Sequence, residues 1–191
     1  MKITDVRLSF PKLFKAEEYT AGDGRPRRSA SFHVAKGSAT DRQLEAEISA
    51  KVLEAFDGNK EKAALFLKKV RGQKTQDCYR VNVEDEGIKV LASHRSAKDG
   101  PVGVYDNTID PTTKKVRVLD ENEGRPYGGC YVNATVDIYI QNKGENQGVR
   151  CSLQAVQFHR DGDAFGGSKP ANPDDFEAPP LEEGSDADAI A

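Results

Sequence analysis

A regular alternation of apolar and polar residues marks segment 127–160. Apolar side chains occupy every second position from Val132 to Ile140, and the same period returns from Val149 to Ala155 after a polar, glycine-containing loop. A period of two places one set of side chains on each face of a β-strand. The segment therefore predicts a long antiparallel hairpin with an apolar inner face.

The alternation changes phase near the end of this segment, where Val156 and Phe158 are apolar on the opposite register. A β-bulge adds one residue to one strand and bends it, which accounts for such a change. Bent strands allow a small sheet to close into a barrel. We therefore expect a bulge in the second strand of the hairpin.

Shorter alternating runs predict further strands. They cover 2–10, 30–34, 79–83, 88–92 and 116–119. Pro11 lacks the amide donor of a sheet ladder, so we expect regular pairing of the first strand to end there. Segment 15–28 is polar and contains Gly22, Gly24 and Pro26, which is typical of a loop.

Segment 40–71 has a helical period instead. Apolar residues recur every four positions, at Leu44, Ile48, Val52 and Phe56. Thr40 begins a sequence that resembles a capping box, and Asn59 can cap a second helix that ends near Arg71. We expect this helical pair to cover one end of the barrel and to contribute packing rather than chemistry.

Charge is distributed unevenly along the chain. Residues 172–191 carry seven acidic side chains and no basic one, whereas the other 171 residues carry 28 basic and 24 acidic ones. From 166 onward no periodicity of a buried element remains, which is typical of disorder. We expect one α+β domain at 1–165, with the helical insertion at about 40–71, and a disordered acidic tail at 166–191.

The sequence lacks the marks of a membrane, exported or catalytic protein. No apolar run approaches the roughly 20 residues of a membrane-spanning helix, and no apolar signal region follows Met1. Cys78, Cys130 and Cys151 are widely spaced, which predicts free, packed thiols in a reducing cytoplasm. The three histidines match no metal-site spacing, and the common catalytic motifs are absent. We expect no enzyme activity, no metal and no cofactor.

Basic and aromatic residues alternate outside the helical pair. Binding of single-stranded DNA without sequence reading needs positive charge along the phosphates and flat rings on which bases stack. The candidate residues are Arg25, Arg27, Arg28, Lys74, Tyr79, Arg80, Arg95, Lys98, Tyr105, Arg125, Tyr127 and Tyr131. Phe14 and Tyr19 are further candidates for stacking. The alternatives are a half-buried sheet ring for each tyrosine and a solvated loop for the arginines of 25–28.

Several short motifs together resemble a family of tailed-phage single-stranded DNA-binding proteins. They are 128–134, the glycine loop after it, 153–158, Asp161-Gly162, the VRLSFP segment at 6–11 and the acidic C-terminus. The resemblance implies an α+β fold with an OB-like antiparallel β-barrel, coating of single-stranded DNA in phage replication or recombination, and a location in the cytoplasm of the infected bacterial host. OB barrels usually carry their helix after the third strand, so a further strand within 11–28 is one explanation for the early helical pair.

The resemblance also implies a role for the acidic tail. A chain of negative charges can occupy a basic groove when DNA is absent and can contact replication or recombination proteins once DNA displaces it. The tail residues expected to do so are Asp174, Asp175, Phe176, Glu177, Glu182, Glu183, Asp186 and Asp188. Self-association is a further expected contact. The alternative function is a protein–protein adaptor or DNA-mimic protein that acts through the tail.

Overall fold

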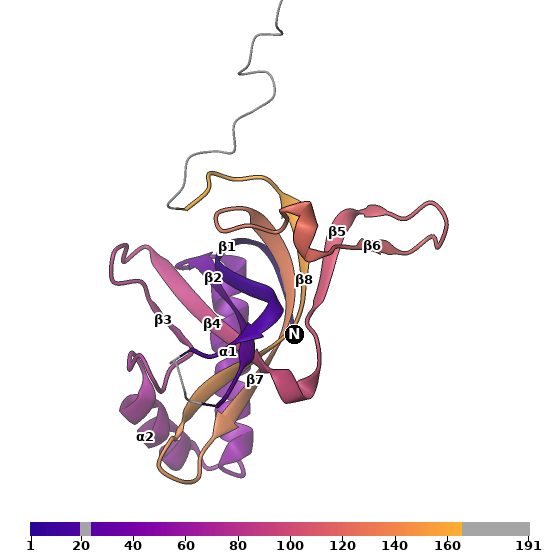
Figure 1. The fold of residues 1–191 in the computed structure, drawn as a ribbon. Helices are drawn as coiled ribbons and strands as arrows, with labels where there is room; N and C mark the ends of the chain where they lie inside the picture. The colour runs from indigo at the N-terminus through magenta and orange to yellow at the C-terminus, as the bar shows by residue number, and fades with distance from the viewer. Residues whose placement is uncertain (20–23, 166–191) are drawn as a thin grey trace, which may run out of the picture.

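The computed structural model describes residues 1–19 and 24–165 (Figure 1). The residues of the acidic tail lie outside these ranges, so the expectation of disorder there is not addressed by the structure. The elements in chain order are β1 (Lys2–Glu17), β2 (Arg27–Ala35), α1 (Ala39–Ala55), α2 (Lys60–Val70), β3 (Tyr79–Val81), β4 (Ile88–Ser96), η1 (Ala97–Asp99), β5 (Gly103–Ile109), β6 (Val116–Val118), η2 (Glu121–Glu123), β7 (Tyr131–Gln141) and β8 (Gly148–Arg160).

Five of the strands close into a barrel. The sheet order is β3-β4-β2-β1-β7-β8-β5-β6, and an additional parallel pairing between His94 of β4 and Ser152 of β8 closes the ring. Taken in chain order, the barrel strands β1, β2, β4, β7 and β8 are therefore connected 1-2-3-5-4-1. This is the connectivity of a five-stranded Greek-key OB barrel, and the predicted fold class is confirmed.

The long hairpin is confirmed as β7 and β8. The two strands pair antiparallel, from Tyr131 opposite Arg160 to Gln141 opposite Gly148. Register shifts at Tyr131/Val132 and at Thr135/Val136 account for the change of phase in the second strand. Apolar side chains of both strands are buried in the barrel, including Val132, Val136 and Leu153.

The first strand differs from the prediction. β1 continues past Pro11 to Glu17, and a shift between Ser9 and Lys12 in its pairing with β2 accommodates the proline. The expected loop at 15–28 is therefore shorter, and no separate strand lies in its described part. In this barrel the helical pair instead follows the second strand, β2.

The helical pair is confirmed, although α1 begins earlier than expected. Its N-cap is Ser38, whose hydroxyl accepts from the Asp41 amide at 3.1 Å, so Thr40 lies within the helix. α1 buries Leu44, Ile48 and Val52 and packs on β2 and β7. Asn59 caps α2 as predicted.

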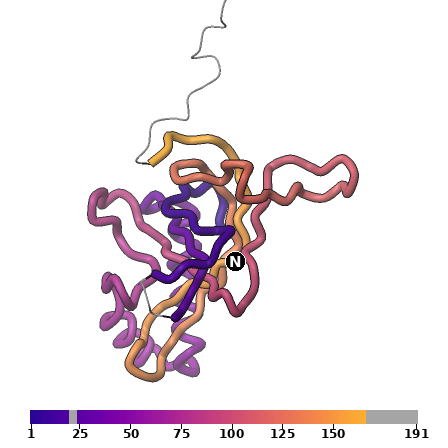
Figure 2. The backbone as a smooth tube through the Cα atoms, viewed as in Figure 1, coloured from indigo at the N-terminus to yellow at the C-terminus, as the bar shows by residue number. Residues whose placement is uncertain are grey.

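A two-stranded arm projects from the barrel (Figure 2). β5 pairs in parallel with β8 over 103–105 and then continues outward with β6 as its antiparallel partner. The sequence predicted the short strand at 116–119 but no strand at 103–109, so β5 was missed. Among the described residues, no helix is long and apolar enough to cross a membrane.

Candidate nucleic-acid interface

The pairing of the strands aligns side chains in rows across the outside of the barrel. In β2, buried residues alternate with half-buried Ser29, Ser31 and His33, which therefore lie on the outer face. One row consists of Arg7, His33, Val90 and Arg80, and another consists of Lys12, Ser29, His94 and Ser152. We call the outer surface formed by these rows, with Arg27 at its end, the β2–β4 face.

Short side chains occupy the middle of the β2–β4 face. Ser31 of β2 lies opposite Ala92 of β4, between the two rows. Basic side chains border this floor, with Arg7 and Arg80 at the two ends of one row. A floor of short side chains between basic borders allows a charged chain with flat bases to lie close to the sheet.

Two candidate arginines meet where β2 and β4 pair. Arg28 lies directly opposite Arg95, and each guanidinium donates to the carbonyl oxygen of Gly100 at 3.3 Å. Arg28 also donates to the Phe14 carbonyl, and Arg95 donates to the side chain of Gln154. These acceptors are neutral, so within the described part of the chain neither arginine has a carboxylate partner.

Arginines elsewhere on the barrel and arm are neutralised by carboxylates. Arg117 pairs with Asp106 and Glu123, and Arg160 pairs with Asp5 at 3.0 Å. Around the β2–β4 face, by contrast, the arginines that donate to main-chain carbonyl groups are Arg7, Arg80 and Arg150. Positive charge without a carboxylate acceptor therefore gathers on one side of the barrel.

The two histidines of the face have lowered pKa values. Burial is the larger cause for His94, and the guanidinium groups of Arg27 and Arg150 lower its pKa further, against the charge of Asp99. Burial likewise lowers the pKa of His33, together with the charge of Arg7 and against the charges of Asp85 and Glu84. The nearby arginines therefore add to the effect of burial at both histidines.

Exposed rings flank the face. Tyr19 is 79% exposed and lies 5.7 Å from the Arg27 guanidinium. At the other end, the Phe165 ring lies 5.2 Å from the His33 ring, with the Arg7 guanidinium 4.2 Å from its centre. Phe10 is 82% exposed at the β1 bulge and has a left-handed backbone with φ of 47°. A non-glycine residue in this region is strained, which is frequent at functional sites.

Tyr79, one of the residues predicted to bind DNA, is buried and not available for stacking in this structure. Its ring is 1% exposed, and its hydroxyl donates to Asp41 at 2.7 Å. Burial and this hydrogen bond raise the pKa of Tyr79. Burial alone would raise the pKa of Asp41, but hydrogen bonds from Lys89, the Gly37 amide and Tyr79 outweigh it and lower that pKa. Tyr79 therefore anchors α1 to the sheet.

The other predicted tyrosines differ in where they lie. Tyr131 of β7 pairs with Arg7 of β1 and so extends the row of Arg7 and His33, whereas Tyr105 and Tyr127 lie outside the two rows. Tyr105 lies on β5 and lines a hollow that also includes Phe14 and Arg28. The Tyr127 hydroxyl donates to Asp161 at 2.9 Å. Arg160 covers the Tyr131 ring at 3.4 Å.

The predicted Arg125 lies with this second group of residues. Its guanidinium is 3.5 Å from Asp161 and lies over the Phe158 ring. Its charge is therefore partly compensated, unlike that of Arg28 or Arg95.

The remaining predicted basic residues border the face. Lys98 and Arg25 are exposed, and the Ala97 amide donates to the Pro26 carbonyl, which joins their two segments. Lys74 is exposed in the turn before β3, next to Thr75, whose carbonyl accepts from Arg150. The structure thus gathers eight of the candidates on or beside the β2–β4 face, namely Arg25, Arg27, Arg28, Lys74, Arg80, Arg95, Lys98 and, through its pairing with Arg7, Tyr131.

Sequence reasoning missed Arg7, Arg150 and Phe165. The available signal was the alternation itself, because Arg7 and Arg150 occupy polar positions beside buried Leu8 and Cys151. Phe165 gave no such signal, since it follows the last strand. Among the described residues, no group of three or more His, Cys, Asp or Glu side chains could hold a metal ion.

The sequence and the fold are both similar to those of phage proteins. The family described as Enterobacter phage Enc34, ssDNA-binding protein, matches residues 1–190. Putative protein p50 of Acyrthosiphon pisum secondary endosymbiont phage 1 is 34% identical over 186 residues, which cover 93% of this chain and 92% of p50.

Two solved structures share the fold. One is the single-stranded DNA-binding protein of bacteriophage Enc34 in complex with ssDNA, with a TM-score of 0.64 and 20% identity over 86% of this chain and 88% of that one. The other is a second structure of the single-stranded DNA-binding protein from bacteriophage Enc34. Its TM-score is 0.60, with 20% identity over 91% of this chain and 87% of that one. The sequence match over nearly the whole length confirms the resemblance seen in the short motifs. The chain belongs to the family of the Enterobacter phage Enc34 single-stranded DNA-binding protein.

Proposed function

We propose that this protein coats single-stranded DNA without reading its sequence, and that the β2–β4 face is the binding surface. The observation that carries the proposal is the gathering of arginines without carboxylate partners around a floor of short side chains. Family membership supports DNA as the ligand, because a family relative has been solved with ssDNA.

Phosphate contacts come from the guanidinium groups on the β2–β4 face and from Arg28 and Arg95. These two alternate with Ser29 and His94 and so point to the opposite side of the sheet, at the end of the barrel beside the face. Arg28 and Arg95 are side by side, and like charges opposite each other destabilise a sheet. A phosphate between or beside them removes this repulsion and accepts forked hydrogen bonds. These contacts go to the backbone of the nucleic acid and therefore carry no sequence information.

Stacking comes from exposed rings at the ends of the face. Tyr19 and Phe165 each lie beside an arginine, so a base can stack on the ring while its phosphate meets the guanidinium. Such stacking contributes about 1–3 kcal/mol per base and tolerates every base, because all bases have a flat π-face.

The acidic tail competes with DNA for this face. Residues 166–191 follow directly after Phe165, which contacts Arg7 and His33 at the border of the β2–β4 face. The seven acidic side chains of 172–191 can therefore reach the basic border without a long linker. When DNA displaces the tail, its acidic residues and Phe176 become available to replication or recombination proteins of the infected host cell.

Anisotropy of a labelled oligonucleotide tests the proposal, with the intact protein and with a protein that lacks residues 171–191. We expect both forms to bind single strands more tightly than duplex, with affinity that falls as salt rises. The shortened protein should bind more tightly than the intact one. Absence of binding by both forms would overturn the proposal and would favour an adaptor or DNA mimic, which binds DNA-binding proteins rather than DNA.

A further inference from the structure

Both edges of the eight-stranded sheet carry exposed valines. β3 ends the sheet on one side, where Val81 is 42% exposed and Val83, just beyond the strand, is 97% exposed. β6 ends it on the other side, where Val116 is 39% and Val118 is 67% exposed. The two edges point to opposite sides of the barrel (Figure 1), so one molecule cannot bring them together.

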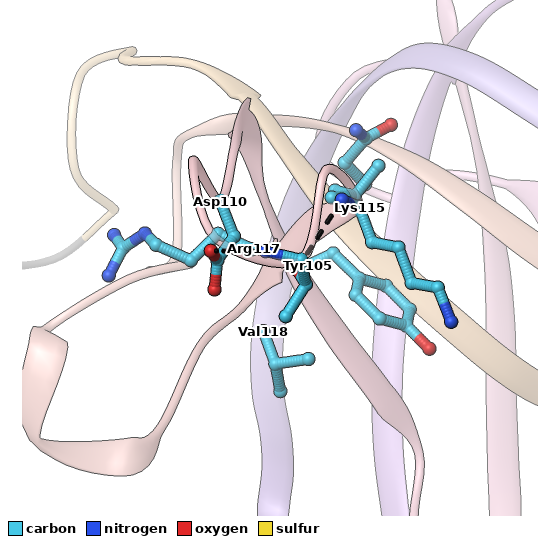
Figure 3. Close-up of a pocket in the computed structure, with 8 residues that line it drawn as sticks. Tyr105, Asp110, Lys115, Arg117 and Val118 are labelled. Carbon is cyan, nitrogen blue, oxygen red and sulfur yellow. Dashed lines mark hydrogen bonds between the residues drawn. The ribbon is translucent and has the colours of Figure 1, made fainter.

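The β5–β6 arm contains an open hollow with a mainly apolar lining, at which Lys115, Arg117 and the acidic Asp110 also lie. Its volume is about 640 Å³, and Tyr105, Val116 and Val118 are among its lining residues. Lys115 also lines it and extends in the same direction as the Tyr105 ring (Figure 3). Neither Lys115 nor its neighbour Lys114 forms an ion pair with a described residue.

An ion pair between Arg117 and the buried Asp106 joins the two strands of the arm. Arg117 extends away from Tyr105 (Figure 3) and donates to Asp106 at 2.7 Å and to Glu123. Burial alone would raise the pKa of Asp106, but the hydrogen bonds from Arg117, the Asn107 amide and Thr108 outweigh it and lower that pKa. The anchored arginine ties β6 to β5. Lys114 and Lys115 then outnumber Asp110, whose carboxylate accepts from the Thr112 and Thr113 amides, so the turn of the arm keeps a net positive charge.

The turn between β3 and β4 has the opposite charge. Three consecutive acidic residues, Glu84, Asp85 and Glu86, directly follow the exposed Val83. The turn has a defined shape, because Asp85 Oδ1 accepts from the Gly87 amide at 2.8 Å and the Asn82 side chain accepts from the Glu84 amide at 3.2 Å. The exposed Val83 side chain is therefore followed directly by an acidic turn of defined shape.

We propose that a second copy of this chain docks head to tail, with its Val83 in the hollow of the arm and its acidic turn on Lys114 and Lys115. The apolar side chain matches the apolar lining, and the three acids match the two lysines at the rim. The contact joins two different surfaces at opposite sides of the molecule, so it does not close into a dimer and extends into a row of copies.

A row of copies suits a protein that covers a polymer, and this consequence rests on the proposed function. The contact is small, so it is weak between free molecules. Two copies bound side by side on one strand are held at a high effective concentration, which makes a weak contact sufficient. The edges of the sheet then determine how cooperatively the protein covers DNA.

Disulfide trapping tests the contact in the absence of DNA. Val83→Cys and Val118→Cys proteins of different mass, one carrying a tag, are mixed and oxidised. We expect the mixed disulfide between the two variants to exceed both homodimers, and a Val83→Cys/Val118→Cys double variant to form a ladder. Homodimers as the main product, or no cross-link beyond the wild-type level, would overturn the proposal.

The natural cysteines do not compete in this experiment. Cys78, Cys130 and Cys151 are buried, and burial raises the pKa of Cys78 to about 12 and of Cys130 to about 11. Because the thiolate is the reactive form, these three thiols react slowly. The wild-type protein provides the matched control.

Charge reversal tests the chemistry of the contact. Glu84→Lys/Glu86→Lys in the Val83→Cys protein should lower the yield of mixed disulfide about tenfold, and Lys114→Glu/Lys115→Glu in its partner should restore it. If the yield of mixed disulfide stays the same after both charge reversals, the acidic turn and the lysines do not form the contact.

DNA binding by the Glu84→Lys/Glu86→Lys protein separates the contact from the proposed function. Binding to an oligonucleotide that holds one copy should be retained, while cooperative binding to a long strand should weaken about tenfold. Unchanged cooperativity would overturn the head-to-tail contact. Failure of the wild-type protein to bind any oligonucleotide would instead contradict the proposed function and leave the disulfide result standing.

Discussion

Arg28 and Arg95 face each other across the pairing of β2 and β4, and both donate to the carbonyl oxygen of Gly100 at 3.3 Å. A neutral carbonyl oxygen shared by two guanidinium groups leaves most of their charge uncompensated. The fold therefore holds two positive charges together with no carboxylate between them in the described part of the chain. This arrangement is what a site for a phosphate backbone requires.

Arg28→Ala and Arg95→Ala should each weaken binding to all single-stranded sequences alike. Each should also reduce the dependence of log affinity on log salt by about 0.7, the share of one phosphate on a single strand. Salt titrations by anisotropy measure both quantities. Arg160→Ala is the matched control, because Arg160 is already paired with Asp5, and it should change the slope less. Equal effects of all three substitutions would indicate a general charge effect instead of a site.

Tyr19→Ala should weaken binding by about 1–3 kcal/mol, the contribution of one stacked base, while the salt slope stays the same. Tyr19→Phe keeps the ring and should retain the affinity. Tyr105→Ala removes a ring on β5 outside the two rows of the β2–β4 face, and should leave binding unchanged. If Tyr105→Ala weakens binding and Tyr19→Ala does not, the rings have been assigned to the wrong surface.

Tyr79→Phe should lower the free energy of unfolding by about 1–3 kcal/mol, because buried Asp41 loses a hydrogen-bond donor. The affinity of the folded protein for DNA should not change. Denaturant unfolding and anisotropy provide the two measurements. Tyr139→Phe is the control, since its exposed ring has little to lose. If Tyr79→Phe has normal stability but binds DNA more weakly, Tyr79 contributes to DNA binding and the prediction is wrong.

Binding should take up a proton at His94. The pKa of His94 is lowered in the free protein, and a nearby phosphate raises it, so affinity should increase as pH falls from about 8 to about 6. His94→Gln should reduce this pH dependence, whereas His159→Gln, at an exposed position outside the face, should not. Calorimetry in buffers of different ionisation enthalpy measures the proton directly. Equal proton uptake in wild type and His94→Gln would contradict the assignment.

The free protein should respond to pH in the opposite sense. A histidine whose pKa is lower in the folded than in the unfolded chain favours the fold above about pH 6.5. That stability is lost as the pH falls through the lower folded value. His94 and His33 both have lowered pKa values, so acid should destabilise the free protein and DNA should offset the loss. Thermal unfolding with and without DNA measures this difference.

The hairpin could be predicted from the sequence because its alternation is long and one face is buried. The same reasoning failed at Phe10, where apolar Val6 and Leu8 suggested that the ring points inward. The bulge between Ser9 and Lys12 breaks the alternation and leaves Phe10 82% exposed. A bulge beside a proline depends on the partner strand, which a local pattern does not contain.

The candidate site could be predicted only in its charged part. The arginines of β2 and β4 could be predicted as binding residues because basic residues cluster locally in the sequence. The antiparallel pairing of the two strands then places Arg28 opposite Arg95. Whether each tyrosine is buried or exposed was harder to predict, because a period of two separates the two faces of a strand without showing which face is buried. Tyr79 faces the core because Asp41 of α1, which is 38 residues away in sequence, accepts from its hydroxyl.

Photo-cross-linking with an iodouracil-substituted oligonucleotide tests the central claim most directly, because the cross-link forms at the residue that contacts a base. Mass spectrometry of the cross-linked peptides identifies that residue. We expect cross-links at Tyr19 and Phe165, which flank the β2–β4 face, and their loss in excess unlabelled single-stranded DNA. Cross-links confined to Tyr105 on β5, which lies outside the two rows of the β2–β4 face, would place the DNA on the arm and contradict the account.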